Sequence, residues 1–309
     1  MAAKWTPDDI PDQSGRSAVV TGANSGIGAV AARELAAHGA RVVLAVRSVE
    51  KGDAAAAGMT GDVEVRRLDL ADLSSVRAFA EAFDRDLDLL VNNAGVMALP
   101  HRTTVDGFEM QIGTNHLGHF ALTGLLLPRL MATATPRVVT VASGAHRMGR
   151  IDFRDLHSER KRYRKWNAYG QSKLANLLFA YELQRRAETE GVGLRSVAAH
   201  PGWSATNLQF AGPEMAGSRL EHRGAALMNR IIAQDDEHGA WPTLYAATTV
   251  ALPGGSYVGP DGFMELHGHP KVVTSSGRSK DRDAAARLWA LSEDLTGVHY
   301  PFAAPAPAG

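Results

Sequence analysis

The sequence predicts a doubly wound α/β protein, with a mostly parallel seven-stranded sheet and helices on both of its faces. Short runs rich in β-branched residues alternate with longer segments in which apolar residues recur every three or four positions, as in strands joined by crossover helices. This alternation continues without a break from Ser17 to about Val258, so nothing separates two cores. The chain has 309 residues, of which 45% are hydrophobic, and this is enough material for one large core.

Seven apolar runs are expected to form the strands. They are residues 17–21, 41–46, 63–68, 87–91, 137–141, 194–199 and a weaker run at 256–258. The periodic segments between them, residues 27–37, 74–83, 107–130 and 168–186, are expected to form crossover helices. Because crossovers between parallel strands are right-handed, the strands should take a doubly wound order.

The ends of the chain and two internal segments do not follow the alternation. Residues 1–14 are expected to form an N-terminal extension to a single domain at 15–300, and residues 301–309 have the composition of a disordered tail. A basic run within residues 151–167 is expected to be a solvated loop. Residues 203–238 mix large apolar side chains with polar ones, which suits either a lid over an apolar pocket or an ordinary surface helical hairpin.

Composition excludes several classes of protein. The 33 basic and 33 acidic residues cancel, which removes the broad electrostatic reason for binding nucleic acid. The absence of cysteine excludes disulfides, thiolate metal sites and a cysteine nucleophile. No metal site is expected, because His267 and His269 have no clustered carboxylate beside them. No segment has the apolar length of a membrane span or of a signal peptide, so a cytoplasmic location is expected.

A glycine-rich turn, T-G-A-N-S-G-I-G, follows the first strand and leads into the first helix. A pyrophosphate needs exposed backbone N–H groups and close approach of the main chain, and a helix N-terminus favours its negative charge. In this strand–turn–helix context the turn predicts a dinucleotide-binding Rossmann loop, although its glycine spacing differs from the more common G-x-G-x-x-G. The alternative is a turn that only tightens the junction. The loop residues are Gly22, Asn24, Ser25, Gly26, Ile27 and Gly28.

The end of the second strand bears on the choice of cofactor. An NAD-selective protein would place a carboxylate there, whereas this chain has Val46 followed by Arg47. A guanidinium suits the 2′-phosphate of NADP(H), so NADP(H) is favoured over NAD(H). The alternative is an exposed arginine with no ligand.

Two later strand ends are expected to complete the cofactor cleft. Asp69 and Leu70 follow the third strand, where Asp69 is placed to accept from an adenine amino group or to serve as a simple loop aspartate. The fourth strand leads into N-N-A-G, in which Asn93, Ala94 and Gly95 would line the cleft with small residues and backbone, though an ordinary turn has the same composition.

Tyr169 and Lys173 lie four residues apart in a predicted helix and therefore on one face. A free phenol titrates near pH 10, too high for a base at neutral pH. A cation about 5 Å away contributes roughly 3 kcal/mol at an effective dielectric near 20, or about two pKa units. We therefore expect Lys173 to lower the pKa of Tyr169.

Two polar residues are candidates to join this pair. Ser143 follows the fifth strand, where its hydroxyl can donate to a carbonyl oxygen that gains charge, or can cap a turn. Asn115 lies among apolar residues of a predicted helix, so its amide needs a partner. That partner is either a water that relays protons or a protein group in the core.

These residues resemble the short-chain dehydrogenase/reductase family. The T-G-x-x-x-G-x-G loop, N-N-A-G, the set Asn115, Ser143, Tyr169 and Lys173, and the P-G at Pro201 and Gly202 match its pattern in order, from about residue 15 to the end. Within the family, A-N-S-G-I-G, T-N-H-L-G-H-F, S-K-L-A-N and H-P-G-W-S-A-T are similar to the retinol-dehydrogenase-like branch. Many animal members of that branch have an N-terminal membrane anchor, and no such anchor is expected in this sequence. Membrane attachment and retinoid chemistry are therefore not carried over from the resemblance.

The resemblance implies a role for each matching residue. Tyr169 would be the general acid/base, Lys173 would lower its pKa and bind the nicotinamide ribose, Ser143 would orient the substrate oxygen, and Asn115 would hold the relay water. Thr206, after Pro201 and Gly202, would reach the nicotinamide carboxamide. The implied reaction is hydride transfer between nicotinamide and a carbonyl or alcohol of a small lipophilic molecule.

The resemblance also implies NADP(H) as the preferred cofactor, with NAD(H) as the alternative, and pairing into a homodimer or homotetramer through the helices of Asn115 and Tyr169. Two other functions stay open at this point. One is an NADP(H)-binding sensor or scaffold without turnover, since a fold does not guarantee a chemistry. The other is a protochlorophyllide-reductase-like enzyme, although that branch relies on cysteines.

Overall fold

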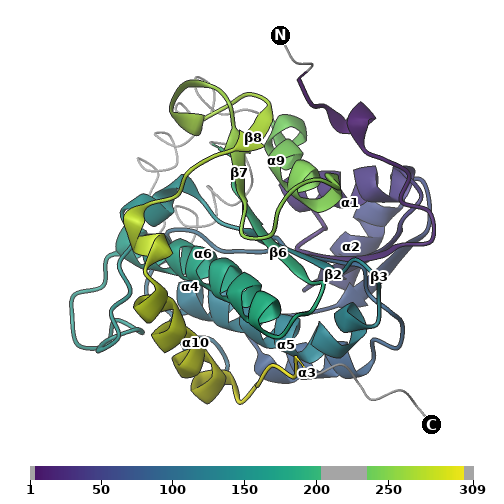
Figure 1. Ribbon diagram of the computed structural model, residues 1–309. Helices are drawn as coiled ribbons and strands as arrows, with labels where there is room; N and C mark the ends of the chain where they lie inside the picture. The colour runs from purple at the N-terminus through teal and green to yellow at the C-terminus, as the bar shows by residue number, and fades with distance from the viewer. Residues whose placement is uncertain (1–3, 203–234, 303–309) are drawn as a thin grey trace, which may run out of the picture.

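A computed structural model describes residues 4–202 and 235–302, and its centre is one eight-stranded sheet (Figure 1). The strand order is β3-β2-β1-β4-β5-β6-β7-β8, with β7 and β8 antiparallel and all other neighbours parallel. The strands are β1 Ser17–Thr21, β2 Arg41–Val46, β3 Val63–Arg67, β4 Leu89–Asn92, β5 Arg137–Val141, β6 Arg195–Ala199, β7 Tyr257–Pro260 and β8 Pro270–Val272.

The doubly wound α/β class predicted from the sequence is confirmed, and the sheet has one strand more than the seven expected. That strand, β8, has three residues, begins with a proline and lies at the edge of the sheet. Lys271 and Val272 are exposed, so the segment has none of the apolar pattern by which buried strands are recognised.

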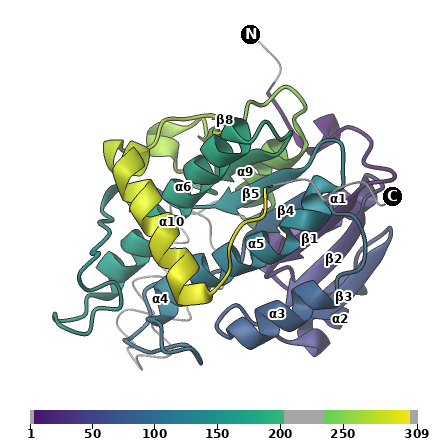
Figure 2. The same cartoon turned by 60° about the horizontal axis from the view of Figure 1, so that its bottom comes forward.

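Helices cover both faces of the sheet (Figures 1 and 2). One apolar cluster joins Val20 and Leu44 of the sheet to Leu35 and Leu244 of the helices on one face. A second cluster, on the other face, extends from Val19 to α10. Because successive strand residues point to opposite faces, the continuous apolar runs of β1 and β2 supply both cores. The helices are α1 Gly26–Ala37, α2 Val49–Ala56, α3 Leu73–Glu81, α4 Met110–Ile112, α5 Gly118–Met131, α6 Lys165–Thr189, α9 Asp236–Thr248 and α10 Arg282–Thr296.

The helix expected over residues 107–130 is shorter and irregular. Gly107 has a positive φ of 84°, which ends any helix there, and Glu109 caps α4 by accepting from the backbone N–H groups of Gln111 and Ile112. A π-helical segment, η2 (Gly113–Leu117), then separates α4 from α5. Such π turns arise from tertiary context and are frequent at functional sites, and η2 contains Asn115.

Three of the observed helices, α2, α9 and α10, were not expected from apolar periodicity. Only Gly52 of α2 is buried, and a Cβ at that position would lie 2.5 Å from Val65, so this helix packs through its backbone. In α10, Asp281 caps the N-terminus and Gly297, with a φ of 62°, ends the helix. Figure 2 shows α10 lying across α6 on the outside of the molecule.

The described parts of both termini pack on the domain. Ile10 is buried in the core, and the Trp5 ring lies edge-on to that of Tyr245. The tail predicted for residues 301–309 starts too early, because Phe302 is buried against Tyr300 and Trp289. Residues 303–309, and the predicted lid as far as residue 234, lie outside the described residues.

Each helix within residues 4–202 and 235–302 is too short or too polar to span a lipid bilayer.

We predict that Gly28→Ala destabilises the protein by about 1–3 kcal/mol, because the added methyl group would overfill a tight contact. Its Cβ would lie 2.4 Å from the Asn93 amide nitrogen and 2.6 Å from the Gly22 carbonyl oxygen. Urea unfolding measures the effect. The matched control is Gly277→Ala, where nothing lies within 4 Å. Equal stability of the two variants would contradict the prediction.

Candidate active site

The glycine-rich loop lies at the carboxyl end of β1, and two of its glycines have positive φ values, 68° at Gly22 and 58° at Gly26. A Cβ on Gly22 would lie 3.0 Å from Ala94, which follows β4. The close contact of Gly28 with Asn93 brings α1 against the ends of β1 and β4. The loop therefore presents backbone on a narrow path between the two strands, a cradle that any side chain would fill.

The N-terminus of α1 faces the same loop. Ser25 is the N-cap residue, yet its hydroxyl makes no capping hydrogen bond, which leaves the first N–H groups of the helix without a side-chain partner from Ser25. Ser25 is exposed and Asn24 is half-buried, whereas Ile27 is buried in the core and anchors the helix. This arrangement fits a pyrophosphate, which accepts from such N–H groups.

Thr21, the last residue of β1, joins the loop to the N-N-A-G segment. Its hydroxyl oxygen accepts from the backbone N–H groups of Asn93 and Ala94, each at 2.9 Å. The Asn93 amide donates to the Thr21 carbonyl at 2.8 Å. Sequence reasoning missed Thr21, although its place immediately before the first glycine was a signal that could have found it.

The ends of β2 and β3 carry two guanidinium groups. Arg47 directly follows β2 and is exposed. Arg67 ends β3 in register with Val46, a pairing that the sequence did not reveal. Asp69 uses one carboxylate oxygen to accept from the backbone N–H of Ala71, as expected of a loop aspartate.

Leu70 is buried beneath α5, where its carbonyl oxygen would lie 2.4 Å from a Cβ on Gly118.

Asn115, Gly95 and Lys173 converge at the carboxyl ends of β4 and β5. The Asn115 side-chain oxygen accepts from the backbone N–H of Val96 at 2.7 Å, and its nitrogen donates to the Val96 carbonyl and the Ser172 hydroxyl, both at 2.9 Å. A Cβ on Gly95 would lie 3.1 Å from the Asn115 oxygen and 3.5 Å from the Lys173 ammonium. The amide of Asn115 is therefore satisfied within the protein, the second of the two alternatives considered above.

Lys173 lies one helical turn after Tyr169 on α6, and both side chains are buried. The Lys173 ammonium donates to the Val141 carbonyl at 3.0 Å and lies 5.9 Å from the centre of the Tyr169 ring. Burial lowers the pKa of Lys173 to about 8. The two side chains share one face of the helix, as their spacing predicted.

The pKa of Tyr169 departs from the sequence-based expectation. Burial of the phenol raises this pKa to about 12, and a hydrogen bond with Ser143 acts in the opposite direction. The Lys173 ammonium, 5.9 Å from the ring centre, is not among the groups that offset the cost of desolvation. In this state of the protein Ser143, and not Lys173, is the side chain that lowers the pKa of Tyr169.

Ser143 follows β5 and caps the short helix η3 (Gly144–Arg147), with its hydroxyl accepting from the Ala145 N–H at 3.2 Å. His146 connects this turn to Ser276 through its ring. Its Nε2 accepts from the Ser276 N–H at 3.1 Å, so Nδ1 carries the proton and donates to the Ser143 carbonyl at 2.7 Å. The turn-capping role of Ser143 and its contact with Tyr169 are both present in the structure.

Pro201 and Gly202 follow β6 at the same edge of the sheet. Gly202 has a φ of 70°, and a Cβ there would lie 2.4 Å from the Leu266 carbonyl oxygen. His200 is buried beside them, where its Nδ1 accepts from the Gly202 N–H at 3.2 Å. Thr206 lies outside the described residues.

Within the described part of the chain, no group of three or more His, Asp or Glu side chains is placed to hold a metal ion. His269 instead bonds the Trp5 carbonyl through Nδ1 at 3.0 Å.

The site thus combines a glycine-lined backbone cradle, of a kind that fits a phosphate, with a buried phenol, ammonium and hydroxyl at one edge of the sheet. The sequence model of the short chain dehydrogenase family matches residues 16–215. The chain belongs to this family. Among relatives, it is 41% identical to human retinol dehydrogenase 13 and 42% identical to human retinol dehydrogenase 12. The first match covers 93% of this chain and 86% of the relative, the second 93% and 88%.

Solved structures agree with this assignment. The chain is similar to an uncharacterized protein from Mycobacterium paratuberculosis, with 54% identity, a TM-score of 0.82 and coverage of 97% of this chain and 100% of that one. It is also similar to RhlG of Pseudomonas aeruginosa in an NADP active-site complex, with 26% identity, a TM-score of 0.60 and coverage of 80% and 94%. The protein is therefore a short-chain dehydrogenase/reductase of the retinol-dehydrogenase-like branch, acting on CH–OH and C=O groups.

We predict that the free energy of unfolding of this dehydrogenase increases as the pH rises from about 8 to about 10. Because the pKa of Lys173 is lowered to about 8, the unfolded chain binds more protons than the folded chain over this range. Urea unfolding at several pH values measures the effect, which amounts to roughly 3 kcal/mol at most. Lys173→Met should lose most of this increase, and an unchanged pH dependence in that variant would contradict the prediction.

Proposed function

We propose that this dehydrogenase uses NADP(H) to interconvert a carbonyl and an alcohol on a small lipophilic molecule, with Tyr169 as the general acid/base. The observation that carries the proposal is the meeting of Tyr169, Lys173, Ser143 and Asn115 beside a glycine cradle at the carboxyl edge of the sheet. When bound, the nicotinamide supplies or accepts the hydride.

The protein's own residues would handle the oxygen and its proton. The Ser143 hydroxyl would donate to the substrate oxygen, and the Tyr169 phenol would exchange a proton with it. Since burial raises the pKa of Tyr169 to about 12, the phenol is protonated in the resting protein and ready to act as an acid in carbonyl reduction. In alcohol oxidation, positive charge beside the phenol must first favour the phenolate, which is the role proposed for Lys173.

Residues at the carboxyl ends of several strands would hold the cofactor. The loop from Gly22 to Gly28 and the first turn of α1 would hold the pyrophosphate. Asp69 and Leu70 would flank the adenine, and Ala94 and Gly95 would line the cleft. The Pro201–Gly202 segment, with Thr206 after it, would meet the nicotinamide. Arg47 would bind the 2′-phosphate, and Arg67 at the neighbouring strand end adds a second positive charge.

A lipophilic substrate is supported by large apolar side chains near the catalytic residues. Met148, which follows η3, is 60% exposed, and Trp166, near the start of α6, is 43% exposed. The Trp166 ring lies edge-on to that of Tyr169, with centroids 6.2 Å apart. The retinol dehydrogenases among its relatives are named for a lipophilic alcohol.

We predict that Tyr169→Phe lowers kcat by about 100-fold or more while the dissociation constant for NADPH changes little, because only the acid/base hydroxyl is removed. NADPH oxidation with a panel of aldehydes, ketones, quinones and retinoids measures kcat, and fluorescence titration measures binding. Tyr245→Phe is the matched control, since Tyr245 is a partly buried tyrosine of α9 packed against Trp5. Turnover near the wild-type rate in Tyr169→Phe would remove the proposed role.

We predict that Arg47→Ala weakens NADPH binding by about 30-fold and NADH binding by less than about threefold, since a charge-assisted hydrogen bond contributes about 2 kcal/mol. Fluorescence titration with both cofactors measures this. Arg41→Ala is the control, because Arg41 begins the same strand at the opposite edge and pairs with Asp62. Equal losses for NADPH and NADH would rule out contact with the 2′-phosphate.

A further inference from the structure

His119, on α5, lies between Thr21, which precedes the glycine-rich loop, and Asn115, and the proposed mechanism gives it no role. Its side chain is buried, with 1% of its surface exposed. One ring nitrogen, Nε2, lies 2.9 Å from the Thr21 hydroxyl oxygen, and the other, Nδ1, lies 3.0 Å from the Asn115 carbonyl oxygen. The ring therefore connects the end of β1 with the π turn that carries Asn115.

The hydrogen-bond partners fix the tautomer of this ring. The Asn115 carbonyl can only accept, so Nδ1 carries a proton and donates to it. The Thr21 hydroxyl oxygen already accepts from two backbone N–H groups, those of Asn93 and Ala94, which occupy its two lone pairs. Its own proton is therefore available for Nε2, at a shorter distance than the 3.3 Å to the Val91 carbonyl.

The ring must also be neutral for this arrangement to hold. A second proton on Nε2 would face a hydroxyl oxygen that has no free lone pair. Burial lowers the pKa of His119 to about 4, with a smaller contribution in the same direction from the Lys173 charge. The imidazole is thus an uncharged connector at neutral pH, with a donor at one end and an acceptor at the other.

We propose that His119 is a positioning residue that holds Thr21, at the end of β1, and the main chain at Asn115 in one fixed relation. Through Nε2 it orients the Thr21 hydroxyl, which in turn holds the backbone of Asn93 and Ala94 beside the cofactor cleft. Through Nδ1 it holds the main chain at Asn115, whose side chain lies beside Gly95 and Lys173. This inference rests on the proposed NADP(H)-dependent function.

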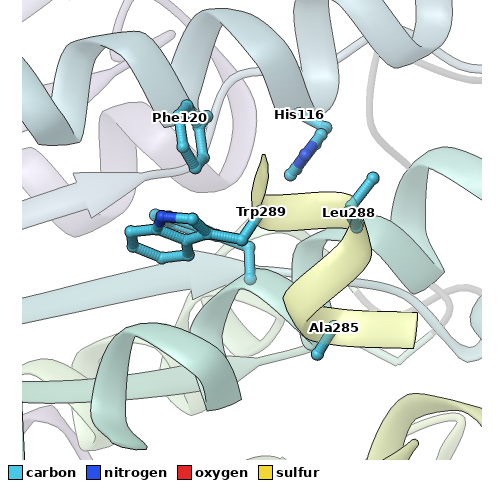
Figure 3. Close-up of a pocket in the computed structure, with 6 residues that line it drawn as sticks. His116, Phe120, Ala285, Leu288 and Trp289 are labelled. Carbon is cyan, nitrogen blue, oxygen red and sulfur yellow. The ribbon is translucent and has the colours of Figure 1, made fainter. Parts of the chain in front are cut away.

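His116 is a natural control, because it lies one turn earlier in the same segment and is as deeply buried. Its Nε2 donates to the Ser292 hydroxyl at 2.9 Å, since that hydroxyl uses its own proton on the Leu288 carbonyl. Figure 3 shows its ring facing Leu288 and Trp289 of α10 across a crevice that leaves no room for a water molecule. His116 therefore supports the packing of α10, and its ring is bonded to Ser292 rather than to Thr21 or the Asn115 carbonyl.

The two halves of the proposal are separable with conservative variants of His119. Asparagine places an amide nitrogen near the position of Nδ1, and glutamine places an amide group near Nε2. His119→Asn should keep kcat within about threefold of wild type and weaken NADPH about tenfold, as expected for one hydrogen bond. His119→Gln should lower kcat about tenfold and keep NADPH affinity within about threefold of wild type. His119→Phe should lower both kcat and NADPH affinity.

The readouts are kcat for carbonyl reduction and the dissociation constant for NADPH from fluorescence titration, with thermal melting to compare stability. His116→Phe should lower the melting temperature without changing kcat or NADPH affinity. If His119→Phe does not fold, Thr21→Val should weaken NADPH about tenfold and Thr21→Ser should not.

Two results overturn the inference: a His119→Phe enzyme that binds NADPH and turns over like wild type, or Asn and Gln variants with the same loss in both measurements. If His119→Phe does not fold, the inference is overturned when Thr21→Val binds NADPH as tightly as the wild-type protein. Failure of the proposed function is distinct, because the wild-type protein itself would then neither bind NADPH nor reduce any carbonyl of the panel.

Discussion

The junction between the carboxyl ends of β1 and β4 is the constraint on which the rest of this site depends. In this strand order the chain leaves β1 toward β2 and leaves β4 toward β5, so a crevice opens where these two connections diverge. Here the junction is closed by polar contacts: the Thr21 hydroxyl holds the backbone of Asn93 and Ala94, and the Asn93 amide holds the Thr21 carbonyl. A side chain on Gly28 would disturb this junction, because its Cβ would overlap the Asn93 amide and the Gly22 carbonyl oxygen.

Burial determines the chemical state of the groups beside this junction. Taking a phenol and an ammonium out of water disfavours the charged form of each, so the pKa of Tyr169 is raised and that of Lys173 is lowered. Hydrogen bonds then set the geometry, with Lys173 on the Val141 carbonyl and Asn115 on Val96 and Ser172. The result is a low-dielectric environment in which a small change of nearby charge has a large effect on proton transfer.

Three histidines of this region are structural connectors. His119, His146 and His200 are each buried, and a ring nitrogen of each bonds the backbone or a hydroxyl at the end of a strand or the start of a turn. Where a carbonyl or a backbone N–H meets a ring nitrogen, the partner determines which nitrogen carries the proton. An imidazole suits these places because it offers a donor and an acceptor on one rigid ring.

Much of the fold and site was determined by the sequence itself, because its signals are local. The strand bounds at 17–21, 41–46 and 137–141, the glycine loop and the pairing of Tyr169 with Lys173 follow from side-chain period and helical spacing. Only the tertiary structure decided the short edge strand β8, the π turn at Asn115, the position of Arg67 beside Val46 and the bridge made by His119. These depend on contacts between residues far apart in the chain, and so does the pKa of Tyr169, where desolvation outweighs the neighbouring charge.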